Sequence, residues 1–136
     1  MPTEAEILGF ANRWYAAALR TAEWIDIGSA RVRLITAPYF LATKLEAFYG
    51  RGKGDYLGSR DIEDIIALVD GRVELVEDIR RADYDLQSYL AHQFTALLCD
   101  TSFADSIPGH LLPDEASHQR RGLIMNRLQE IATMQR

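Results

Sequence analysis

The chain has 136 residues, of which 48% are hydrophobic and 26% are charged, as in an ordinary soluble globular protein with one domain over 1–136. Its formal net charge of −5 argues against a general nucleic-acid-binding surface or a membrane-surface protein. A single cysteine, Cys99, excludes an internal disulfide and fits a cytoplasmic location, and no apolar run approaches the ~20 residues of a membrane span.

The chain divides into a small α/β portion, residues 1–35, and a helical portion, residues 36–136. The first portion begins with a predicted helix, because Thr3 and Glu6 have the spacing of a capping box. We therefore expect an α+β fold that is mostly α, with an N-terminal helix and a β-hairpin followed by a bundle of about five helices.

A β-hairpin is predicted from two β-rich runs, Trp24–Ile27 and Arg31–Ile35, on either side of Gly28-Ser29. Arg31 and Arg33 alternate with apolar residues, so one face is expected to point outward or toward a ligand. Two strands alone are marginal in water, and no later segment resembles a third strand. We expect the strands to pack flat on the helices, to pair with a second copy as a homodimer, or to belong to a larger sheet.

The next helix is predicted to start at Thr36-Ala37-Pro38, because proline is tolerated in a first helical turn. Its core stripe is formed by Leu41, Leu45 and Phe48. Lys44 lies about 60° around the helix from this stripe, and Arg51 follows on the same side two turns later.

A glycine-rich basic loop, 50–55, separates this helix from a second one. Ser59 is the predicted N-cap, and Gly71 the predicted end. The apolar stripe of the second helix comprises Ile62, Ile65, Ile66 and Val69. Asp61 and Asp64 lie in its first two turns, away from that stripe.

The rest of the chain is predicted to be helical, apart from one loop. A short piece, 73–81, precedes a longer helix, 84–99, for which Asp83 is the predicted cap. Residues 100–113 are expected to form a loop with a turn around Phe103, because prolines and glycine punctuate them. Asp114 is expected to start the last helix, whose stripe comprises Ile124, Leu128 and Ile131.

The basic residues Lys44, Arg51 and Lys53 are the candidate phosphate-binding groups. A lysine with a packed stem and a free ammonium suits phosphate, and glycine N–H groups can approach an anion closely. The alternatives are a lysine in a surface ion pair and a plain flexible connection. The loop lacks the order of a Walker A motif.

The acidic candidates are Asp61 and Asp64, with Asp55 in the glycine loop. The pair is suited to binding a metal or orienting a cation, but such carboxylates also stabilise a helix N-terminus by about 0.3–1 kcal/mol each. Asp55 is notable because helix stability does not require an acid there. The histidines have no metal-ligand spacing, and no nucleophile–base set is present, so no catalytic or metal-binding residue is predicted.

The segment 41–51 (LATKLEAFYGR), Asp55 and the segment 59–66 (SRDIEDII) together resemble the downstream half of AbiEii/AbiGii-type nucleotidyltransferases. The resemblance covers roughly residues 1–80. It implies transfer of a nucleotidyl group from an NTP with Mg²⁺, and a toxin–antitoxin context. It also implies that Lys44 supports the nucleotide phosphates, that Arg51 is the basic residue between the motifs, and that the second helix carries the acidic pair.

The metal-binding half of that family, a Gly-Ser turn followed by Asp-x-Asp, has no counterpart here. Gly28-Ser29 leads to no acidic pair, and Gly58-Ser59 is too far from Asp83-Tyr84-Asp85. We therefore expect a truncated or incomplete nucleotidyltransferase-like protein that is not catalytic alone. The competing interpretations are a non-catalytic interaction module, for example one that pairs with an antitoxin chain, and a small ligand-binding helical domain.

Overall fold

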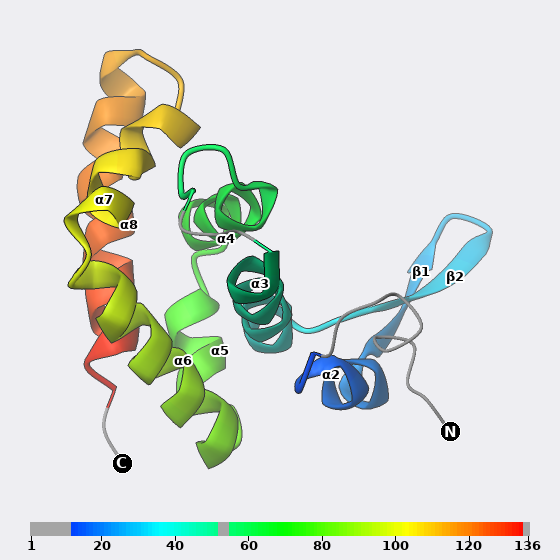
Figure 1. Ribbon diagram of the computed structural model, residues 1–136. Coiled ribbons are helices and arrows are strands. Elements are labelled where there is room, and N and C mark those ends of the chain that lie inside the picture. The colour runs from blue at the N-terminus through cyan, green and yellow to red at the C-terminus, as the bar shows by residue number, and fades with distance from the viewer. Residues whose placement is uncertain (1–11, 52–54, 135–136) are drawn as a thin grey trace.

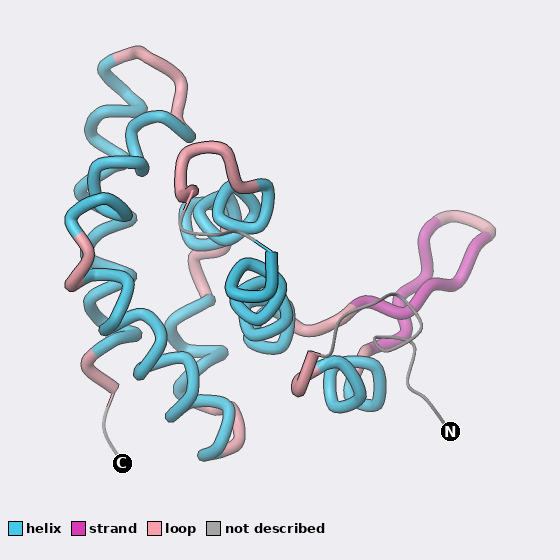
Figure 2. Tube along the Cα trace, viewed as in Figure 1, coloured by secondary structure: helices cyan, strands magenta, loops and turns pink. Residues whose placement is uncertain are grey.

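The structure is a computed structural model that describes residues 12–51 and 55–134. The predicted capping box, Thr3 and Glu6, lies outside these residues, as does Lys53. The described chain is mostly helical with one antiparallel hairpin, which confirms the expected α+β, mostly α, class. Figure 1 shows the hairpin projecting away from the packed helices, and Figure 2 shows the same division by secondary structure.

The hairpin follows a short helix, α2 (Tyr15–Thr21), and consists of β1 (Glu23–Ile27) and β2 (Ala30–Leu34). Gly28 adopts φ = 60°, the left-handed conformation that a tight hairpin turn requires. Every residue of β1 is exposed, and on β2 only Val32 is partly covered. The hairpin is therefore present as predicted, but the expectation that it packs flat on the helices is wrong for the described residues.

The two helices that carry the predicted site are α3 (Ala37–Arg51) and α4 (Arg60–Gly71). Helix α3 begins as the sequence predicts but continues through Gly50 and Arg51, which were predicted to belong to the loop. Helix α4 begins and ends as predicted. Ser59 is the N-cap of α4, and its hydroxyl accepts a hydrogen bond of 3.2 Å from the N–H of Ile62.

The remaining elements are α5 (Leu75–Arg80), α6 (Tyr84–Leu98), α7 (Thr101–Ser106), the 3-10 helix η1 (Ile107–His110) and α8 (Glu115–Ala132). The predicted loop over 100–113 is wrong, because Phe103 and Ile107 are fully buried and fold the segment back onto the core. Pro108 and Gly109 are accommodated in the 3-10 helix η1. Asp83 occupies the N-cap position of α6 but makes no capping hydrogen bond, whereas the carboxylate of Asp114 accepts one of 2.7 Å from Ser117.

The predicted apolar stripes of α3, α4, α6 and α8 meet in one core. Its fully buried members include Leu41, Leu45, Ile62, Ile65, Ile66, Leu90, Phe94, Ile124, Leu128 and Ile131. Helix α8 also closes the end of α4, because the guanidinium of Arg127 donates to the carbonyls of Val69 and Asp70 at 2.7 and 2.9 Å. This guanidinium supplies a partner that the last carbonyls of a helix otherwise lack.

Candidate functional site

Lys44 of α3 and the two acids of α4 come together at the junction of these helices. The ammonium of Lys44 lies 2.7 Å from Oδ2 of Asp64 and 3.7 Å from Oδ1 of Asp61. The side chain of Asp61 is 4% exposed, that of Lys44 27% and that of Asp64 44%. The cluster therefore extends from a buried carboxylate to a half-exposed one, with the lysine between them.

Helix geometry explains this convergence. Asp61 and Asp64 are three residues apart, so they lie on neighbouring positions of one helix surface. Lys44 borders the buried stripe of α3, and its ammonium lies 5.5 Å from the ring centroid of Phe40. The lysine stem is thus partly covered while its charged end remains within reach of solvent.

The charges of the cluster sum to −1, one ammonium against two carboxylates. This arrangement agrees with the alternative of a lysine in an ion pair that ties α3 to α4. The described residues contain no group of three or more His, Cys, Asp or Glu that could hold a metal ion. The cluster is able to bind charged groups, but no metal-dependent step can be derived from it.

Among the other predicted site residues, only Asp55 has a side chain that the structure describes. Arg51 is the last residue of α3, and its side chain, like all of Lys53, is outside what the structure describes. Asp55 has a local role: its carboxylate accepts a hydrogen bond of 2.9 Å from the N–H of Gly58. A side chain at Gly58 would collide with that carboxylate, so this glycine permits the close approach.

The segment before α4 is held by contacts that the sequence analysis did not find. The Tyr56 hydroxyl donates to Asp100 at 2.8 Å, and the ring of His110 lies 2.9 Å from the carbonyl of Tyr56. Burial and the bond to Asp100 raise the pKa of Tyr56 to about 12. These partners are more than forty residues away in the chain, so only the tertiary structure reveals them.

A second cluster lies between α2, α3 and α6. The guanidinium of Arg13 lies over the rings of Trp14 and Tyr89, at 4.6 and 5.0 Å. The Tyr89 hydroxyl donates to Glu46, and burial together with this bond raises the pKa of Tyr89. The cluster anchors the N-terminal helix to the bundle.

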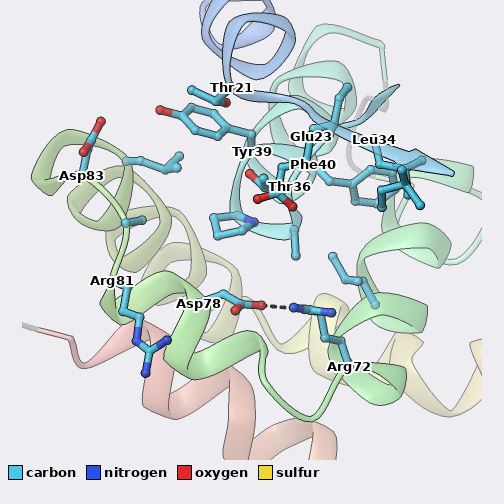
Figure 3. A pocket seen from close by; sticks show the side chains of 17 residues that line it. Thr21, Glu23, Leu34, Thr36, Tyr39, Phe40, Arg72, Asp78, Arg81 and Asp83 are labelled. Atoms are coloured by element: carbon cyan, nitrogen blue, oxygen red, sulfur yellow. Dashed lines mark hydrogen bonds and ion pairs between the residues drawn. The ribbon is translucent and has the colours of Figure 1, made fainter. Parts of the chain in front are cut away.

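A cleft of about 740 Å³ lies beside the hairpin. Figure 3 shows Glu23 and Leu34 of the hairpin on one side of it, with Arg72 and its partner Asp78 on the other. The bond to Asp78 raises the pKa of Arg72. This volume is within the range of small-molecule sites. The cleft could not be predicted from local patterns in the chain, because its lining comes from seven separate elements and their connections.

Fold and site together define a mostly helical α+β protein with a lysine–dicarboxylate cluster and a projecting hairpin. Comparisons of the chain with protein-family models, with curated proteins and with solved structures find no match. None of the helices within residues 12–51 and 55–134 combines the length and apolar character that crossing a membrane requires.

Proposed function

We propose that this chain is a nucleotidyltransferase-like protein that keeps part of a nucleotide-phosphate or acceptor surface and is not catalytic alone. The observation that supports this most is the ammonium of Lys44 held beside Asp61 and Asp64. These are the positions at which the resemblance to AbiEii/AbiGii-type nucleotidyltransferases expects a phosphate lysine and an acidic pair. A cytoplasmic location, where NTPs are abundant, belongs to the same proposal.

The geometry explains how the cluster would select its ligand. A lysine that is already oriented by two carboxylates loses less side-chain freedom when it binds a phosphate. Asp64, the more exposed acid, is the group with which an arriving phosphate competes. A nucleotide that brings Mg²⁺ is favoured over a bare anion, because the metal ion reduces the repulsion between its phosphates and the nearby carboxylates.

A titration with nucleotide tests this proposal. Mg·ATP and Mg·GTP are titrated into the wild type, Lys44→Ala and a matched control, Arg80→Ala, by calorimetry. Arg80 is a suitable control because it is also a cation in an ion pair, with Glu77 at 2.8 Å, but lies on α5. We expect heat of binding from the wild type and the control, and at least about a tenfold weaker affinity for Lys44→Ala.

Two results would count against the proposal. A wild type with no affinity for either nucleotide removes the phosphate-binding role and leaves the ion pair between α3 and α4 as the whole function of the cluster. Equal affinity of Lys44→Ala and wild type would place any nucleotide elsewhere. Circular dichroism of each variant separates a lost contact from a lost fold.

The second proposed function is a non-catalytic interaction module, and the exposed hairpin favours it. A strand pair with open edges provides main-chain groups to which another strand can bind. This proposal includes self-association as a homodimer. It predicts association without any dependence on nucleotide, so the titration above separates it from the first proposal.

A further inference from the structure

The two faces of the hairpin differ in character. The register places Ile25 opposite Val32 and Ile27 opposite Ala30 on one face, with Glu23 opposite Leu34 at its base. Apart from Glu23 this face is apolar. Ile25 and Leu34 line the cleft but remain 39% and 47% exposed, and Ile27 is 58% exposed. Such a run of exposed apolar side chains is costly in water unless something covers it.

The opposite face of the hairpin has its own partners. Trp24 is paired with Arg33, and Asp26 with Arg31. Both guanidinium groups lie over the Trp24 ring, at 5.2 and 5.5 Å, and Arg31 is 3.6 Å from Asp26. Arg33 also donates at 2.5 Å to the carbonyl of Leu19, which ties the hairpin to the end of α2. The charged face is thus stabilised within the chain.

The edges of the hairpin are also open. Among the described residues, β1 and β2 pair only with each other. Within the described part of the chain, each strand therefore has one edge of N–H and C=O groups without a strand partner, and two-stranded sheets are marginal in water. Adding strands to one edge satisfies these groups and enlarges the sheet.

We propose that two copies of this chain associate through β1, in an antiparallel pairing centred on Ile25. In this register Ile25 faces Ile25 of the second copy, Glu23 faces Ile27, and Trp24 faces Asp26. Residues directly opposite in a sheet share a face, so the apolar faces of both hairpins lie on one side. The result is a two-fold symmetric dimer with a four-stranded sheet, in which the two β2 strands form the outer edges.

Charge selects β1 rather than β2 for this contact. The equivalent two-fold pairing of β2, centred on Val32, would set Arg31 directly opposite Arg33 of the second copy at two places. Like charges directly opposite are destabilising, whereas the β1 pairing sets no two like charges opposite. Pairing β1 of one copy with β2 of the next is a head-to-tail contact that leaves the same pair of edges at the ends, so it gives an unlimited chain of copies.

The test measures mass in solution, by sedimentation equilibrium, for the full chain and three single variants. The wild type is expected to be a dimer. Ile25→Lys and Ile25→Glu each place like charges opposite each other at the two-fold axis, and each should weaken association by about tenfold or more. An equal mixture of the two variants should regain the dimer, since lysine then faces glutamate.

Val32→Lys is the matched control. Val32 lies opposite Ile25 on the same face, but on the strand that the proposed contact does not use. This variant should remain dimeric.

The inference is overturned if the wild type is a monomer. It is also overturned if Val32→Lys dissociates the dimer while Ile25→Lys leaves it intact. Failure of the mixture to re-form a dimer also overturns it. Because the Lys44 cluster is not part of this contact, none of these three results depends on the proposed nucleotide surface.

Discussion

Replacing Lys44 by methionine tests how the cluster contributes to the fold, because methionine keeps most of the stem volume and removes the ammonium. At the effective dielectric constant of about 20 that suits such sites, an ion pair at these separations has a gross attraction of about 4–6 kcal/mol. Desolvation offsets most of this attraction. Asp64 is half-exposed, so solvent screens its attraction to Lys44, and this pair contributes about 0.2–1 kcal/mol to the free energy of unfolding.

The larger share of the stabilisation by Lys44 comes from its attraction to Asp61. Breaking a buried ion pair costs about 3–5 kcal/mol, because it leaves a buried charge with less compensation. Lys44 is partly exposed and lies 3.7 Å from Asp61, beyond direct hydrogen-bond distance, so we expect less than the full cost. For Lys44→Met we therefore predict a loss of about 1.5–3 kcal/mol in the free energy of unfolding.

Urea denaturation followed by circular dichroism measures this loss, with Arg80→Met as the control. The control should change stability by less than about 0.5 kcal/mol, because the Arg80–Glu77 pair is exposed on both sides. If Lys44→Met is as stable as the control, the ammonium does not compensate the buried carboxylate and the electrostatic reasoning fails. Asp64→Asn should cost less than Lys44→Met, and the reverse order would contradict the assignment of the larger share to Asp61.

Three further predictions concern single hydrogen bonds. The raised pKa of Tyr89 favours the neutral phenol in the folded state. The stabilisation by Tyr89 is therefore complete below pH 10.0, the ordinary pKa of tyrosine, and is lost as the pH rises above that value. Thermal unfolding should show a smaller loss of stability at alkaline pH for Tyr89→Phe than for wild type. The bond from the N–H of Ser117 lowers the pKa of Asp114, so this cap stabilises above pH 3.8 and is lost as the pH falls through the lowered value. Asp114→Asn should remove that acid-dependent part of the unfolding curve, and an unchanged curve would show that the cap is not the cause. Ser59→Ala should cost about 1 kcal/mol in urea denaturation while Ser59→Asp retains the cap; equal losses in both would argue against capping.

Local patterns in the chain predicted most of the secondary structure. Helix starts at Ser59 and Asp114 follow from side chains that cap, and the hairpin follows from β-branched runs around a glycine turn. The segment 100–113 shows the limit of this reasoning. Its proline and glycine predicted a loop, but burial of Phe103 and Ile107 against distant helices made it helical.

The candidate cluster was predicted in part. Helical periodicity placed Lys44 on one face of its helix and Asp61 and Asp64 on another, since angular position depends only on spacing. Whether the two faces met depended on how α3 packs on α4, and the described structure brings them within 3.7 Å. The role of Asp55 could not be predicted, because its carboxylate bonds within a turn whose shape is not apparent from composition.

The amino-acid sequence by itself determined the class of the fold, the stripes that form the core and the position of the charged residues around each helix. These properties depend on spacing along the chain, which tertiary contacts do not alter. Only the tertiary structure decided that the hairpin stands exposed, that a cleft opens beside it, and that Tyr56 bonds to Asp100. Such features arise where segments far apart in the chain meet, and their packing is a property of the whole core rather than of any one segment.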